Sequence, residues 1–254
     1  MSTAIPPLPP ETAPTGLSEP QRIINTFVSP SKTFEDLKRK SSWFLPWLLI
    51  SIFSLIFGII FVHKVDMTRF VREQIEQSPR AAAAYEQAPP EQREAQVRIG
   101  AKVTEITFYL SPIGTLIGAL ICAAILMAIF NFGFEAGIPY SRYLAIIFYA
   151  WLPLIISSIL VSLVFAVHSD PNTINIRNSI ATNPAYFMDP TSNKFLYGLV
   201  SGLDVFRIWI ICLLGLGISI NAVKGKVSRG SALTTLFVIY AVLVLMAAAW
   251  GART

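Results

Sequence analysis

Two charged residues, Asp204 and Arg207, stand three positions apart in a segment that is otherwise apolar. Charged side chains inside a membrane usually mark a path for ions, protons or a substrate. If a helix begins near Asp204, however, the carboxylate lies in its first turn, where a negative charge is favourable, and Arg207 pairs with it or reaches the lipid headgroups. We expect this structural role, with both residues at the membrane interface, and keep a transport or proton-relay role as the alternative.

Glu135 and Arg142 are a second pair of charges, close to a segment rich in glycine and proline. Gly133, Gly137 and Pro139 in this segment predict the end of a helix. We therefore expect Glu135 to be interfacial, with Arg142 as its candidate partner. The alternative is a carboxylate buried at a gate.

Pro153 lies inside a long apolar run and predicts a kink in the helix that this run forms. Ser157 and Ser158 follow on the same helix and are suited to bond the backbone groups that a proline frees. Such a kink either lines a cavity or serves packing alone.

Small residues form stripes on two apolar runs, Gly114 with Gly118 on the second run and Gly215 with Ser219 on the fourth. Small residues at this spacing let helix backbones approach closely in lipid. We expect these stripes to pack the second and fourth runs against each other. Homodimerisation through the stripes is the alternative.

The remaining reactive residues do not form a recognisable centre. His63 and His168 lack companion acids at the spacing of metal ligands, and Cys122 and Cys212 are separated within apolar runs. The chain also lacks the motifs of metalloproteases, serine hydrolases, P-loop proteins and dinucleotide-binding proteins. We therefore expect no catalysis, no cofactor and no metal ion.

The elements that carry these residues are long apolar runs. The chain has 254 residues, of which 54% are hydrophobic and 14% charged, and the two kinds are segregated into blocks. Each run approaches the roughly 20 residues that cross a bilayer as a helix. The pattern predicts an all-α integral membrane bundle of five transmembrane helices over residues 43–62, 106–132, 143–167, 205–223 and 231–250, which together form a membrane domain over residues 43–254.

The segments outside the runs differ in composition. Residues 1–20 are rich in proline and predict a disordered tail, whereas residues 21–42 predict short amphipathic helices on the membrane surface. The loop over residues 63–105 predicts a small helical cap, with a solvated charged linker as the alternative. The first run lacks the flanks of a cleaved signal and is expected to remain as an anchor.

The basic residues indicate an orientation. Lys38, Arg39 and Lys40 come directly before the first run and favour a cytoplasmic N-terminus, so that five spans place the C-terminus and loop 63–105 outside. The seven basic residues of that loop oppose this orientation. The net charge is +5, and the basic residues lie beside the runs. This position indicates contact with the lipid bilayer and no nucleic-acid surface.

Three sets of short blocks form a pattern along the chain: residues 27–34 with 43–47, residues 137–143 with 149–154, and residues 203–209 with 214–217 and 224–229. In this order and spacing they resemble the YIP family, the Rab-interacting five-span membrane proteins. The resemblance implies a cytosolic N-terminus and a role in membrane organisation or trafficking, which in eukaryotic members includes binding of prenylated small GTPases. The long loop 63–105 is similar to that of the bacterial branch and implies a bacterial inner membrane.

Two functions are consistent with these patterns. The first is a protein without enzymatic activity that binds membrane-protein partners of unknown identity and is a possible homo-oligomer. The second is a small permease or channel that uses the kinked third run and the polar start of the fourth. A polar, water-sized cavity at mid-membrane would favour the permease, and a dry seam of small residues would favour the partner-binding protein.

Overall fold

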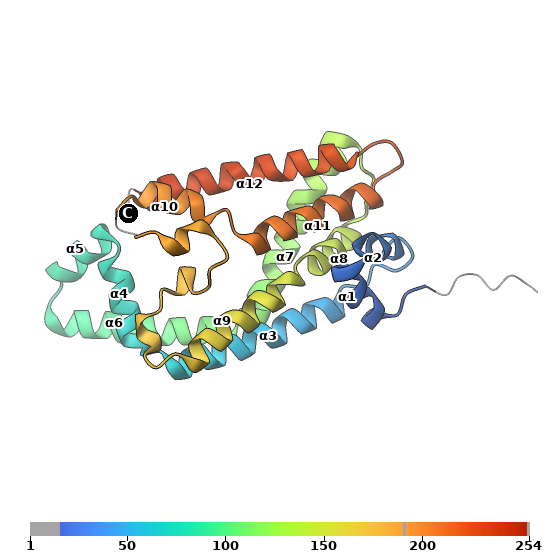
Figure 1. Cartoon of the computed structure of the whole chain (residues 1–254). Helices are drawn as coiled ribbons and strands as arrows, with labels where there is room; N and C mark the ends of the chain where they lie inside the picture. The colour runs from blue at the N-terminus through green and yellow to red at the C-terminus, as the bar shows by residue number, and fades with distance from the viewer. Residues whose placement is uncertain (1–15, 190–191, 253–254) are drawn as a thin grey trace, which may run out of the picture.

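The computed structural model describes residues 16–189 and 192–252, and within these ranges the chain is helical, with no strand (Figure 1). Two short helices come first, α1 (Glu19–Val28) and α2 (Pro30–Asp36). Most of the predicted tail, residues 1–15, lies outside the described residues, but its last two residues already belong to α1. A capping box explains this start, because the Ser18 hydroxyl accepts the Gln21 N–H and the Gln21 side chain accepts the Ser18 N–H.

Four helices are long and apolar enough to cross a membrane. The second begins at Ser111, later than expected, because the preceding helix ends at Tyr109 and Pro112 has no N–H to continue it. The third is interrupted by a turn at Trp151 and Leu152, directly before Pro153. The four are α3 (Phe44–Lys64), α7 (Ser111–Met127) continued by a π-turn over Ala128–Phe132, α8 (Tyr140–Ala150) with α9 (Pro153–Val167), and α12 (Arg229–Gly251).

The predicted fourth run differs from a single straight helix. Its apolar residues form α11 (Val205–Asn221), which follows α10 (Lys194–Ser201) after a break with a bend of 47°. The two helices are together long enough to span a membrane. The structure therefore contains four candidate spans among the described residues, or five if the bent pair crosses as one.

The two long loops also contain regular structure. The charged loop after α3 is helical, as its prolines and alanines predicted, and consists of α4 (Met67–Glu76), α5 (Pro79–Gln87) and α6 (Pro90–Tyr109). The loop after α9 contains three short turns of 3₁₀-helix, η2 (Pro171–Thr173), η3 (Ile176–Asn178) and η4 (Pro184–Phe187).

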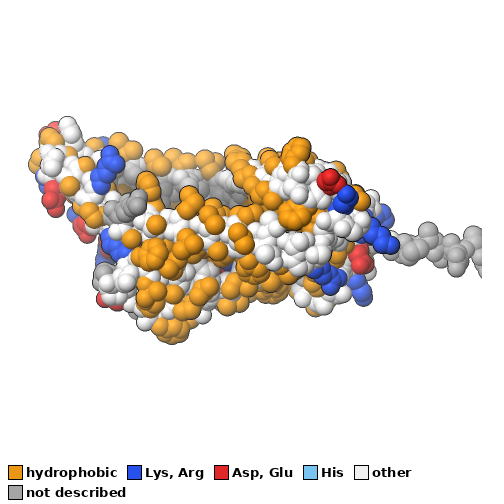
Figure 2. Space-filling model, turned by 90° about the horizontal axis from the view of Figure 1, so that it is seen from above, with side chains coloured by type: hydrophobic (Ala, Val, Ile, Leu, Met, Phe, Trp, Pro, Cys, Tyr) orange, Lys and Arg blue, Asp and Glu red, His pale blue; other side chains and the backbone are white. Residues whose placement is uncertain are grey.

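The bundle is organised around α8. Every side chain from Tyr143 to Ala150 is buried, because α7, α11 and α1 all contact this helix. α3 packs against α7 and α9, and α12 packs against both α10 and α11. Figure 2 shows hydrophobic side chains along the length of the molecule, with the charged side chains gathered towards its two ends.

We name the two ends of the bundle by what they carry (Figure 1). The hairpin end carries α1, α2 and the turn between α11 and α12. The loop end carries α4, α5 and the loop after α9.

The prediction that the second and fourth runs pack through their small residues is wrong. A Cβ atom placed on Gly114 or Gly118 would meet no atom within 4 Å, so this stripe has no neighbour in the bundle. Gly215 instead lies against Leu233 of α12, at 2.5 Å from an ideal Cβ, and the Ser219 hydroxyl bonds Leu216 O in its own helix. The stripes face different neighbours because α7 packs against α3 and α8, whereas α11 packs against α12.

Candidate functional site

The N-terminal hairpin, formed by α1 and α2, is folded into the bundle. We expected residues 21–42 to lie on the membrane surface, but α2 packs against α11 and α1 contacts α8. Phe34 and Leu37 are fully buried. The apolar face that suggested a membrane contact is used for packing against the bundle.

A glycine in α11 makes room for the hairpin. An ideal Cβ on Gly217 would lie 2.9 Å from the ring of Phe34 and 2.7 Å from Ile146 Cγ2, both too close for a real side chain. The buried Asn221 amide donates to the carbonyl oxygens of Phe34 and Gly217, each at 2.9 Å. The backbone of α2 is thereby bonded to α11.

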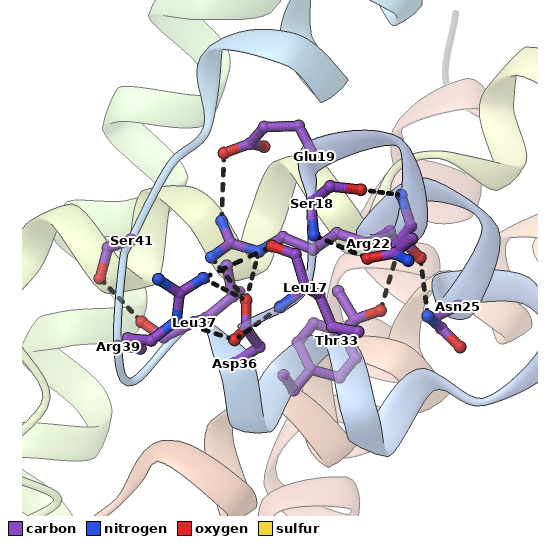
Figure 3. Close-up of polar contacts among 12 residues, drawn as sticks. Leu17, Ser18, Glu19, Arg22, Asn25, Thr33, Asp36, Leu37, Arg39 and Ser41 are labelled. Carbon is purple, nitrogen blue, oxygen red and sulfur yellow. Dashed lines mark hydrogen bonds and ion pairs between the residues drawn. The ribbon is translucent and has the colours of Figure 1, made fainter. Parts of the chain in front are cut away.

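A buried arginine holds the hairpin together (Figure 3). Arg22 is 1% exposed, and its guanidinium lies 2.6 Å from the Asp36 carboxylate and 3.2 Å from Glu19 Oε1. The other oxygen of Glu19 accepts a hydrogen bond of 2.9 Å from the Tyr149 hydroxyl in α8. A continuous polar network therefore joins both helices of the hairpin to the core of the bundle.

The Asp36 carboxylate is the most connected group of this network. Burial alone would raise its pKa, but hydrogen bonds from Arg39 and Arg22 and from the Leu17 N–H lower it below its ordinary value. Because the folded pKa is the lower one, the stabilisation from Asp36 is complete above the ordinary pKa of an aspartate and is lost as the pH falls through the folded value.

We expect acid to loosen the hairpin. A spin label at Val28 should be immobile near neutral pH and should become more mobile only in acid, as the pH falls below the ordinary pKa of an aspartate and through the lower folded pKa of Asp36. In Asp36→Asn the label should already be more mobile at neutral pH and should respond less to acid. An equal response of the two proteins to acid would contradict the role of Asp36.

Arg142 and Glu135 both lie at the hairpin end, but they do not pair. Arg142 donates to Lys38 O at 3.3 Å and to Ser41 Oγ at 3.5 Å, so it fastens the segment between α2 and α3. Glu135 is exposed and pairs with Lys226 in the turn before α12. Its exposure argues against the buried gate carboxylate.

Asp204 caps α11 at the break with α10. Its carboxylate accepts the Arg207 N–H at 3.1 Å and a hydroxyl hydrogen bond from Thr182. The Arg207 side chain is exposed, and no ion pair joins it to Asp204 in the described structure. Tyr240, near the middle of α12, donates to Gly202 O at 2.6 Å, so the break between α10 and α11 lies beside α12. The interfacial position of Asp204 stays a prediction.

The turn before Pro153 borders a groove between α3, α7 and α9. Its volume is about 610 Å³, and it is mostly apolar. Hydroxyl groups are also present on its walls, so it is neither a dry seam nor a fully polar cavity. The lining residues are Ile50, Ser54, Phe57, Gly114, Thr115, Gly118, Trp151, Leu154, Ser157, Ser158, Val161 and Ile176.

The described residues do not assemble a metal centre. No three His, Cys, Asp or Glu side chains of residues 16–189 and 192–252 come together with the geometry of metal ligands. His63 and His168 are exposed, and Cys122 and Cys212 are free.

Sequence reasoning missed the residues that dock the hairpin. Arg22 falls within the segment 21–42 that predicts amphipathic helices, and Tyr149, Gly217 and Asn221 fall within predicted spans. One signal was available, because a tyrosine or asparagine within an apolar helix needs a hydrogen-bond partner.

A comparison with known proteins covers nearly all of these elements. The family model of the Yip1 domain matches residues 24–250, from the middle of α1 to the last turn of α12. No curated protein and no solved structure matches the chain. The match includes the second half of α1, α2, their contact surface on α8 and α11, and the candidate spans, whereas Glu19 and Arg22 lie just before it. This membrane protein therefore belongs to the Yip1 domain family.

Proposed function

We propose that the protein organises the membrane by binding other membrane proteins at its hairpin end, and that it does so without catalysing a reaction. The supporting observation is the docked hairpin. It is held by a buried ion-pair network, yet Ile24 and Val28 on α1 are 61% and 73% exposed. These residues are four positions apart and share one helix face, and a rigid exposed apolar face is suited to protein contacts.

The charges around this face fit a site at a membrane surface. Lys38, Arg39 and Lys40 are exposed beside the hairpin, where basic side chains attract anionic lipid headgroups. A partner that reaches α1 along the membrane would therefore meet an apolar face beside a basic rim. We propose that this end is cytoplasmic and that the membrane is a bacterial inner membrane.

We further propose five spans, with α10 and α11 crossing together, so that the C-terminus is external. A reporter that is active only in the cytoplasm should be inactive when it is fused to residue 254 and active when it is fused ahead of residue 16. An active C-terminal fusion would contradict the odd number of spans.

Photo-crosslinking tests the partner surface. A photoreactive residue at Ile24 or Val28 of the full chain should give a protein adduct in native membranes, whereas the same residue at Glu35, which is exposed on α2, should not. Ile24→Asp should abolish the adduct formed from position 28, because a charge on this face must be desolvated on binding. Adducts with lipid alone, or equal protein adducts from all three positions, would contradict the proposal.

A small permease is the second candidate. The broken pair α10 and α11 favours it, because transporters often bind their substrates at helix breaks, and the Asp204 cap lies at this one. Flux of small ions or metabolites into vesicles containing the purified protein, lost in Asp204→Asn, would establish this role. Absence of flux together with a specific adduct at Ile24 would support partner binding.

A further inference from the structure

A small cleft lies at the loop end, between α3, α4 and the residues around η2. Its volume is about 200 Å³. Phe61, Phe70 and Phe165 form an aromatic cluster on one side, with ring centroids of Phe61 and Phe165 5.1 Å apart. The other walls are polar, and include the Arg69 guanidinium and the Glu73 carboxylate, which pair at 2.9 Å. The cleft therefore presents one positive and one negative group above an apolar floor.

The larger groove between α3, α7 and α9 adjoins this cleft. Ile176 lines both hollows. Phe57 of the groove and Phe61 of the cleft are four residues apart on α3, and Val161 and Phe165 have the same spacing on α9. Residues four apart lie one above the other on one helix face. The cleft and the groove therefore lie next to each other along the bundle, and the rings of Phe57, Phe61 and Phe165 pack together at their junction. We call the two together the hollow.

The groove is suited to a flexible apolar occupant. Gly114 and Gly118 leave its α7 wall open, with no atom within 4 Å of either Cβ position. Its volume falls in the range of roughly 300–1,000 Å³ typical of small-molecule sites. Because the groove lies among spanning helices, its occupant is surrounded by lipid and must be largely apolar.

We propose that this hollow binds one phospholipid with a zwitterionic, amine-bearing headgroup. The phosphate would contact Arg69, the ammonium group would contact Glu73, and one acyl chain would follow the groove towards Trp151. The assignment rests on the order of the lining side chains along the bundle. They are polar at the loop end and apolar within the spans, which matches the headgroup and acyl chain of a lipid in the adjacent leaflet. This site does not depend on the proposed role of the hairpin.

A helix of a second copy is a less suitable occupant. Gly114 and Gly118 have the spacing that favours helix pairing. Pairing would explain the open face of α7. Helix pairing would not explain the cleft at Arg69 and Glu73, which lies at the loop end beside α4. A lipid accounts for both hollows with one molecule.

Binding can be measured on the full chain purified in mild detergent, by native mass spectrometry. The probes are phosphatidylethanolamine, phosphatidylglycerol with the same acyl chains, and soluble glycerophosphoethanolamine. We expect phosphatidylethanolamine to bind about tenfold more tightly than either of the others. Equal binding of the two lipids would overturn the headgroup assignment, and equal binding of the soluble headgroup would overturn the chain assignment.

Variants separate the two parts of the site. Arg69→Gln with Glu73→Gln should remove the preference for phosphatidylethanolamine, and Gly118→Phe should weaken both lipids about tenfold by filling the groove. Ile125→Phe is the matched control, since Ile125 is exposed on α7 and lines neither hollow. Thermal unfolding shows whether each variant is folded. If Gly118→Phe does not fold, Gly114→Leu is used in its place to fill the groove. Two results would overturn the proposal. One is unchanged lipid binding in a folded groove variant, and the other is a dimer of the unsubstituted protein that Gly118→Phe dissociates.

Discussion

Arg22→Met is expected to lower the free energy of unfolding by about 3 kcal/mol, because removal of one partner leaves buried charges uncompensated. Methionine preserves much of the volume of the side chain but supplies no donor. Asp36 would keep its bonds to Arg39 and to the Leu17 N–H, whereas Glu19 would lose its only ion pair in the described structure. Denaturant titration in mild detergent, followed by a fluorophore on the hairpin, measures the loss.

Arg39→Met is the matched control. Arg39 binds the same carboxylate, but its side chain is 53% exposed, and an exposed ion pair contributes about 1 kcal/mol or less. If both variants lost the same stability, burial of Arg22 would not be the source of the effect.

Gly217→Leu is expected to displace the hairpin from the bundle. Its Cβ alone would overlap Phe34 and Ile146, and forcing extra carbon atoms into a packed core costs about 1–3 kcal/mol or more. The hairpin is the easier element to move, because α8 and α11 are fixed by their other neighbours. The expected result is a protein whose spans remain folded while residues 19–36 become accessible to protease.

Gly118→Leu serves as its control, since it makes the same change on a helix of the bundle. No atom lies within 4 Å of its Cβ position, so the new side chain should enter the groove with little effect on stability. We expected the opposite from the sequence alone. Equal protease sensitivity of the two variants would show that docking of the hairpin does not depend on the absence of a side chain at Gly217.

The helical class and the positions of the long helices follow from the sequence because lipid imposes them. A run of apolar residues long enough to span a bilayer has to satisfy its own backbone, and this leaves a helix. Pro153 likewise predicted a kink, since it has no N–H to donate, and the structure has a turn at Trp151 and Leu152 directly before it. The helical nature of residues 67–109 followed from local signals of the same kind.

The contacts between helices did not follow, because apolar side chains pack equally well against lipid and against protein. Nothing in the spacing of Gly114 and Gly118 indicates that their face is open, while Gly215 and Gly217 are covered. The break before α11 depends on Thr182, which lies in a distant loop and supplies partners to Asp204 and Val205. The docking of Phe34 depends on residues near the far end of the chain.

The bond from Asn221 to Phe34 O joins residues 187 positions apart. Since a ribosome makes the N-terminus first, the hairpin emerges long before the surface that will cover it. Until α11 is inserted, Phe34 and Leu37 have no place to bury and remain an apolar surface that chaperones and proteases recognise. A chain that stops short of α11 would keep this surface exposed, so the first helices to be made can dock only after α11 has been inserted.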